Sequence, residues 1–495
     1  MTGSRLGVGD DVGSPEPLVA AGELVDSSTL WEWTSWMAQM GPRHTGTHAH
    51  DAFVVWIRNR LRDLDVTVDV HTQTFEAWDA ERWSLALVDG PVEEPVEVSS
   101  YFNYSGATGP DGVVGPLVDV GRATPEEVAG ADLAGAIAVV RQRTSITLGE
   151  LLTYARHVGL DLDFSPEDDW SSIVRRSLGP PESRSDPHAF ARLGFGIHLT
   201  PDLAPLAAAG AVGAVVVLED ASPDALRGQW APILKPVQGL PALFVDSVVG
   251  ARLHDRAAER GQARLVLEAT IGMRSTDQLV VDLPGSDLDD EVVLVVTHTD
   301  GPNAVDENGP VALVSLLKLF AGRRRGTHRR RFVFVFATGH CTAGVESVSA
   351  VFGQRPDLLD RVAACLCIEH LGATEWLDSP DGMVATGRSE PAVCYVSEDD
   401  RLVEATAAAL DAHGVDNVWL ARPLGKRFML GEAAAPSLLG LPTVAYLPSP
   451  TYLLAMADDG HLDKLDAGRM QREVAAMADL LCRLDAMPRV PRASA

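Results

Sequence analysis

Residues 292–318 read VVLVVTHTDGPNAVDENGPVALVSLLK, an apolar, β-branched run that gives way to polar residues and then to a helical pattern. Two later stretches repeat the apolar run and its polar ending, namely RRFVFVFATGHCTAG (330–344) and RVAACLCIEHLG (361–372). Each run predicts a buried strand. In an open α/β sheet ligands bind beyond the carboxyl ends of the strands, so we expect the three polar endings to meet in one crevice.

Seven residues at these strand ends have side chains that bind metals or transfer protons. They are His298, Asp300, Asp306, His340, Cys341, Glu369 and His370. The imidazole of His298 and the carboxylates of Asp306 and Glu369 form a set that suits Zn²⁺, and also Mn²⁺ or Fe²⁺. We expect Asp300 to accept the second N–H of the His298 imidazole and so to fix its tautomer.

The adjacent residues His340 and Cys341 leave three interpretations open. One of them could bind a metal while the other faces the substrate, since zinc accepts thiolate ligands readily. Cys341 could instead be a catalytic thiol, with its thiolate favoured by a nearby imidazolium. Both could also be loop residues without chemistry. Cys365 and Cys367 lie on one face of the third apolar run, which indicates thiols buried in the core.

The composition is that of a globular protein, with 46% apolar residues and a length of 495 residues that favours two domains. The formal net charge of −28 argues against a nucleic-acid partner, because phosphate binding requires an excess of Lys and Arg. No apolar stretch reaches the about 20 residues of a membrane helix, and the N-terminus lacks the apolar core of a signal peptide. The five cysteines show no disulfide spacing, so we expect a cytoplasmic protein. Its expected partner is a small-molecule or peptide substrate.

The order of elements predicts an α/β domain that is interrupted by a second, mostly β domain. Residues 1–25 are rich in Gly, Pro and Asp and are expected to be disordered. Helices and strands alternate in 26–100 and again in 269–495, whereas 101–268 contains short β-like runs in Gly- and Ala-rich sequence. Within that region, the Pro-, Ser- and charge-rich residues 165–187 are expected to form a lid-like loop. Periodic apolar residues predict helices over 49–64, 310–322, 401–413 and 467–484.

These motifs resemble those of the M28 family of di-zinc aminopeptidases, in the form that carries an inserted protease-associated domain. His298-Thr299-Asp300 resembles the H-x-D motif of that family, and Asp306 lies where its metal-bridging Asp is found. GPLVDVGRATPEEVAGADLAGAIAVVRQ (115–142) resembles part of the inserted domain. The resemblance covers about residues 27–485 and implies a mixed central sheet flanked by helices, with 101–268 as the insertion.

The chain departs from the family pattern where the family's chemistry lies. The family's Glu-Glu pair, a general base followed by a metal ligand, is replaced by His340 and Cys341, and its metal-binding Asp by Glu369. Its last metal-binding His falls on Met456, with His461 five residues further on. The resemblance therefore implies one metal site with hard ligands, most readily for zinc, and a second site that is altered or empty.

The function implied is that of a metal-dependent hydrolase that cleaves an amide bond in a peptide or in an amino-acid-derived small molecule. His340 would act as base or acid, and His370 would bind the substrate. The expected metal ligands are His298, Asp306, Cys341, Glu369 and His461. Two alternatives stay open. The same scaffold could perform unusual or non-hydrolytic chemistry in a specialised pathway, or it could be a non-catalytic descendant that binds a peptide.

Overall fold

Three parallel strands form the centre of the molecule, as the apolar runs predict. They are β10 (Leu288–His298), β11 (Arg330–Ala337) and β12 (Val362–Ile368). β10 pairs with β11 on one side and with β12 on the other, and the side chains of the three apolar runs are buried almost without exception. The residues described by this computed structural model are 15–144, 171–185, 201–230, 236–323, 327–340, 342–425 and 427–492.

The central strands belong to a mixed sheet with the order β9-β11-β10-β12-β17-β15-β16-β6. The added strands are β9 (Gln262–Leu283), β17 (Thr443–Pro448), β15 (Ala392–Val396), β16 (Val418–Ala421) and β6 (Val174–Leu178). β17 runs parallel to β12, whereas β9 is antiparallel to β11 and β15 is antiparallel to β17. Because β10, β11, β12 and β17 point the same way, their carboxyl ends lie at one edge of the sheet.

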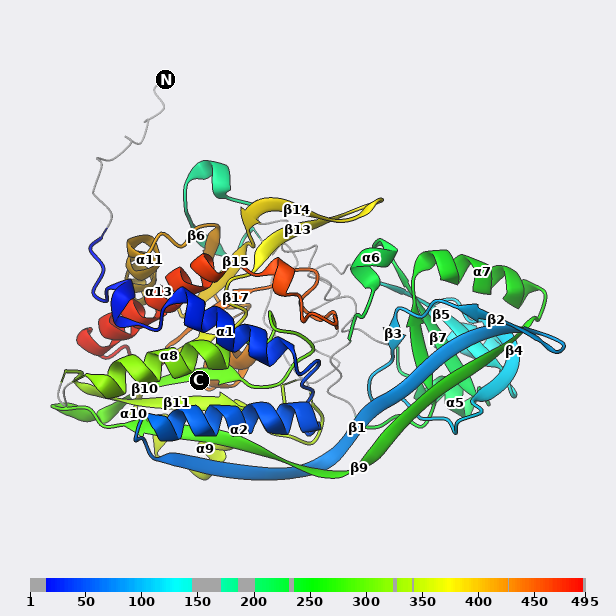
Figure 1. The fold of residues 1–495 in the computed structure, drawn as a ribbon, viewed down its shortest axis with the longest axis horizontal. Helices are drawn as coiled ribbons and strands as arrows, with labels where there is room; N and C mark the ends of the chain where they lie inside the picture. Colours follow the sequence, from blue (N-terminus) through cyan, green and yellow to red (C-terminus); the bar gives the residue numbers. More distant parts are fainter. Residues whose placement is uncertain are drawn as a thin grey trace, which may run out of the picture.

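Helices cover both faces of this sheet (Figure 1). One face packs against α1 (Ser27–Ala38), α2 (His48–Asp63), α8 (Gly309–Gly322), α11 (Asp400–Ala412) and α13 (Ala467–Ala486). The other face packs against α9 (Val348–Gln354), α10 (Leu358–Arg361) and α12 (Ala434–Leu438). Neighbouring residues of β10 alternate between the two cores, with Val293 in the first and Leu294 in the second. The four helices predicted from the sequence are confirmed as α2, α8, α11 and α13. In the part of the chain that is described, no helix is both long and apolar enough to cross a membrane.

A second group of strands, with its own apolar core, lies beside the main sheet (Figure 1). It contains β3 (Ser100–Tyr101), β4 (Val113–Asp119), β5 (Ile137–Arg143), β7 (Gly213–Glu219) and β8 (Ala242–Val245). Two 22-residue strands, β1 (Val68–Asp89) and β9, pair antiparallel and run from the main sheet into this group. The domain boundary expected at residue 268 therefore falls inside β9, which serves both parts.

The remaining elements of the two parts are β2 (Val92–Val96), β13 (Thr374–Ser379), β14 (Gly382–Ser389), α3 (Pro125–Gly130), α5 (Ala204–Ala208), α6 (Pro223–Leu226) and α7 (Ser247–Ala258).

Two expected irregular segments differ from the prediction where they are described. Within the expected lid-like loop 165–187, β6 pairs antiparallel with β16 at the edge of the main sheet, so this part of the loop is a sheet strand. Residues 165–170 and 186–187 of that loop lie outside the described residues. In the expected disordered lead-in, Val19 is fully buried and the backbone N–H of Leu18 donates to Asp479 of α13. The described end of the lead-in is therefore docked on the main domain, and residues 1–14 lie outside the description.

Candidate metal site

His298 closes β10, and its imidazole is fully buried. Its Nδ1 lies 2.9 Å from the backbone carbonyl oxygen of Asp300, which assigns the ring proton to Nδ1 and the lone pair to Nε2. Nε2 has no hydrogen-bond partner in the described chain and lies 3.7 Å from Oε2 of Glu369. Burial and the neighbouring His340 lower the pKa of His298 to about 3, so the ring is neutral, which is the form that binds metals.

The structure corrects the role expected for the Asp300 carboxylate. The backbone carbonyl of Asp300, and not its side chain, accepts the hydrogen bond from His298. The carboxylate instead accepts a hydrogen bond from the hydroxyl of Thr45, whose oxygen lies 2.9 Å from Oγ1 of Thr342. Burial raises the pKa of Asp300 to about 7. The side chain of Asp300 therefore joins the loops on either side of the strand end and leaves the orientation of His298 to the main chain.

Asp306 lies in the loop between β10 and α8, with a buried carboxylate that has no hydrogen-bond partner among the described residues. Asn303 fixes this loop, because its Oδ1 accepts the backbone N–H groups of Val305 (2.8 Å) and Asp306 (3.1 Å). Nδ2 of Asn303 also donates to the carbonyl of Leu453 at 2.6 Å. A Cβ at Gly301 would collide with the Asp306 carboxylate, so this close approach requires glycine. The loop thus holds the Asp306 carboxylate beside His298 and His340, with their ligand atoms within 4.8 Å of one another.

Glu369 and His370 follow the end of β12. Oε1 of Glu369 accepts the backbone N–H of Glu432 at 2.9 Å, and burial raises the pKa of Glu369 to about 7. His370 has a left-handed backbone with a φ of 58°, and its Nδ1 donates to the carbonyl of Pro448 at 2.6 Å. This leaves Nε2 of His370 at 3.4 Å from Oδ1 of Asp306 and 3.8 Å from Oε2 of Glu369. His370 therefore lies among the candidate metal ligands, whereas the sequence had suggested that it binds substrate.

Four buried atoms in this group lack hydrogen-bond partners within the described ranges. They are Nε2 of His298, Oδ1 of Asp306, Oε2 of Glu369 and Nε2 of His370. Three of the six pairs that these atoms form lie 3.4, 3.7 and 3.8 Å apart, close to the about 3.3–3.6 Å between ligand atoms of a tetrahedral zinc site with bonds of about 2.0–2.2 Å. Buried carboxylates without partners are costly unless they pair with a cation. Ligand atoms of His298, Glu369 and His370 lie within 4.8 Å of one another, as do those of His298, Asp306 and His340, so the residues present fit a divalent metal ion.

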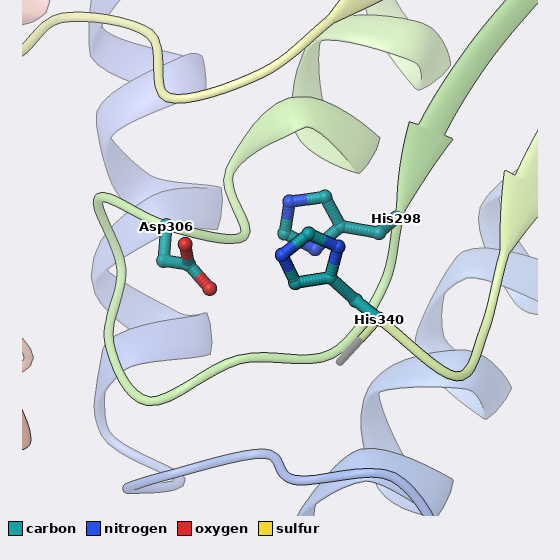
Figure 2. A group of neighbouring side chains, drawn as sticks. All are labelled: His298, Asp306 and His340. Carbon is teal, nitrogen blue, oxygen red and sulfur yellow. The ribbon is translucent and has the colours of Figure 1, made fainter. Parts of the chain in front are cut away.

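His340 follows β11, and its ring lies over the ring of His298, with Asp306 facing both (Figure 2). The two ring centroids are 4.0 Å apart and the ring planes differ by 13°. Nδ1 of His340 lies 2.9 Å from Oε1 of Glu432, and Oε2 of Glu432 accepts the hydroxyl of Ser347 at 2.8 Å. Burial alone would raise the pKa of Glu432, but the hydrogen bonds from His340 and Ser347 hold it below its ordinary value, so Glu432 is a carboxylate.

Two further residues were predicted as ligands. Cys341 lies outside the described residues. His461 belongs to a separate group on the loop before α13, together with Asp459 and Asp463. The ligand set that the structure brings together therefore comes from the ends of β10 and β12 and from the loop before α8.

Glu432 is a residue of the site that sequence reasoning missed entirely. It lies 92 residues from His340 in the chain, within GEAAAPSLLG (431–440), and no local motif marks it. His370 did carry a signal, since it follows Glu369 directly at the end of an apolar strand. A histidine at that position could bind either the metal or the substrate. The direction of the backbone after β12 decides which of the two it faces.

No protein-family model matches this sequence, and no curated protein is similar to it in sequence. Solved structures match its fold over nearly the whole chain. The aminopeptidase from Aneurinibacillus sp. strain AM-1 is 15% identical with a TM-score of 0.59, over 96% of this chain and 98% of that chain. The peptidase M28 precursor from Shewanella amazonensis SB2B is 15% identical with a TM-score of 0.65, over 94% and 96%. BSAP, a zinc aminopeptidase from Bacillus subtilis, is 14% identical with a TM-score of 0.59, over 92% and 94%. At these identities the similarity is one of fold, and the chain has the mixed α/β fold of the M28-type zinc aminopeptidases.

Proposed function

We propose that this protein is a metal-dependent hydrolase that cleaves an amide bond in a peptide or in an amino-acid-derived small molecule. The observation that carries the proposal is the cluster of buried histidine and carboxylate ligand atoms at the carboxyl ends of the strands, which lack hydrogen-bond partners among the described residues. The fold shared with zinc aminopeptidases supports the same chemistry, and it makes zinc the first choice of metal.

The residues of this chain have distinct roles in the proposed reaction. His298, Asp306, Glu369 and His370 would hold the ion. A divalent ion bound there supplies Lewis acidity toward a carbonyl oxygen and lowers the pKa of water. His340 accepts a proton from the attacking water and returns it to the leaving nitrogen, the task of a general base and acid. A histidine suits this task at neutral pH, because its ordinary pKa is about 6.5.

One ion per chain is part of the proposal. In the family that the sequence resembles, a second ion needs a ligand where Met456 lies here. The sulfur of Met456 lies 3.3 Å from the hydroxyl of Tyr101, which donates to it. A thioether engaged in this way is a poor ligand for zinc.

We also propose that residues 101–268 form an inserted protease-associated domain and that the protein is cytoplasmic. The separate apolar core of the second strand group supports the first point. The second is supported by Cys365 and Cys367, which are buried as free thiols with their sulfur atoms 3.8 Å apart, an arrangement suited to a reducing compartment.

Metal analysis and a substrate screen test the proposal together. Protein purified without chelator should contain about one equivalent of divalent metal per chain, as a single closed ligand set implies. It should also release free amine from at least one aminoacyl amide or short peptide. His298→Ala should lose both the metal and the activity, whereas His254→Ala, at an exposed histidine, should keep both. Metal without amine release from any substrate would favour non-hydrolytic chemistry, and protein without metal would favour a binding role.

A further inference from the structure

The stacking of His340 on His298 limits what His340 can bind. An imidazole binds a metal through a lone pair in the plane of its ring, at about 2.0–2.1 Å from the nitrogen. The two ring planes differ by 13° and the centroids are 4.0 Å apart, so the lone pairs of His298 and His340 lie in separate, nearly parallel planes. Ligand atoms of His298, Asp306 and His340 do lie within 4.8 Å of one another. Two stacked rings would nevertheless not both direct a lone pair at one ion.

We propose that His340 is a proton-transfer group beside the metal ligands and not a further ligand, and that Glu432 is the residue that positions it. This inference rests on the proposed function and deepens it. The solvent exposure of the His340 side chain agrees with a role in proton transfer. The side chain of His340 is 16% exposed, whereas those of the four candidate ligands are at most 4% exposed. His340 therefore lies on the side of the site that solvent reaches.

Glu432 is 6% exposed and contacts the site in two ways. Its carboxylate takes a donor at each oxygen, Nδ1 of His340 at 2.9 Å and the hydroxyl of Ser347 at 2.8 Å. Its backbone N–H donates to Oε1 of Glu369 at 2.9 Å. Rotation of the side chain would break both carboxylate bonds and leave a buried charge unpaired, which is costly. One residue thus fixes the proton-transfer group through its side chain and a candidate ligand through its backbone.

Gly431 allows Glu432 to approach this closely. Its φ of 67° lies in the left-handed region, where a side chain is strained. A Cβ at this position would also lie 2.6 Å from Oε1 of Glu369. Glycine therefore meets two requirements at once, and it lets the backbone of Gly431–Ala433 pass directly beside the ligand carboxylate.

The contact with Glu432 determines which nitrogen of His340 reacts. A carboxylate that accepts from Nδ1 keeps the ring proton there and leaves Nε2 as the proton acceptor. As the oxygen of water bonds to the substrate carbonyl carbon, one proton of the water passes to Nε2. The same proton passes to the leaving nitrogen as the C–N bond breaks, so His340 ends in its initial form. Glu432 stabilises the imidazolium that exists between the two transfers and does not take up the proton itself.

The test compares Glu432→Ala, Glu432→Gln and His340→Ala with Glu346→Ala, a control at an exposed neighbour. Metal per chain should stay at the wild-type value in all four variants, because none removes a ligand. For Glu432→Ala we expect kcat to fall roughly 10²- to 10³-fold with KM little changed, the size of a general acid–base effect. Glu432→Gln should recover part of kcat, because an amide oxygen still accepts from Nδ1.

A second readout does not depend on turnover. In zinc-loaded protein labelled with ¹⁵N-histidine, the hydrogen-bonded Nδ1–H of His340 should give a downfield proton signal that is absent from both His340→Ala and Glu432→Ala. Persistence of this signal in Glu432→Ala would overturn the positioning role even if no substrate were known. Loss of metal in His340→Ala would overturn the assignment of His340 as a non-ligand. If the wild type hydrolyses no amide but the signal behaves as expected, the proposed function fails while the pairing of His340 with Glu432 stands.

Discussion

Replacing Glu307 with alanine is expected to destabilise the fold by about 3–5 kcal/mol, because it removes the ion-pair partner of the buried guanidinium of Arg43. The side chains of Arg43 and Glu307 are both fully buried and form an ion pair beside the Asp306 loop. Burial lowers the pKa of Arg43 to about 9. Burial therefore disfavours the charged guanidinium, which nevertheless stays protonated at neutral pH. The predicted loss is a large part of the stability of an ordinary domain, about 5–15 kcal/mol.

A double variant separates the charge from the other contacts of Arg43. The Nη1 group of Arg43 also donates to the backbone carbonyls of Met37, at 2.7 Å, and Gly41. With both Arg43→Met and Glu307→Met in place, the buried ion pair is removed as a whole, and the loss reduces to two hydrogen bonds of about 1 kcal/mol each. We therefore expect the double variant to lose about 2 kcal/mol, less than Glu307→Ala alone.

Urea denaturation followed by tryptophan fluorescence measures these free energies of unfolding. Arg82→Ala is the control, since it removes an ion pair with Glu268 whose side chains are 55% and 29% exposed, and it should cost less than about 1 kcal/mol. A loss below about 1 kcal/mol for Glu307→Ala would refute the reasoning, because solvent would then compensate the guanidinium. A double variant less stable than the single one would refute it as well.

Three further predictions concern the site and the packing around it. His370→Ala should remove most of the bound metal in elemental analysis, whereas His461→Ala should leave it unchanged; retained metal with a raised KM would instead favour the substrate-binding role. Gly431→Ala adds a collision with a ligand carboxylate to the strain of a positive φ, so it should lower both metal content and melting temperature. Gly414→Ala has a similar φ of 61° in open space, and it should cost only about 1–2 kcal/mol and keep the metal. Burial alone would raise the pKa of Asp479, but its hydrogen bonds hold the pKa below the ordinary value. Its stabilising effect should therefore be complete above that value and fade as the pH falls below about 4. Asp479→Asn should be less stable than wild type in denaturation at pH 7, and an equal deficit at pH 3 would contradict this.

The sequence by itself determined the central sheet and its main helices. The apolar runs at 292–297, 331–337 and 362–368 correspond to β10, β11 and β12, because parallel strands buried on both faces need apolar residues at nearly every position. Helical periodicity likewise located the long helices, since it reflects one buried face. The meeting of His298 with Glu369 also followed from sequence, because parallel strands bring their carboxyl ends to one edge.

Only the tertiary structure decided how the site is oriented and supported. Asp300 orients His298 through its backbone, and His370 turns toward the ligands because its φ is positive and the carbonyl of Pro448 on β17 holds its Nδ1. The partner of His340 comes from Glu432, far along the chain. Each of these contacts joins segments that are distant in sequence, and each depends on the backbone direction just beyond a strand end. Apolar periodicity reports which faces are buried, and it carries no information about those directions.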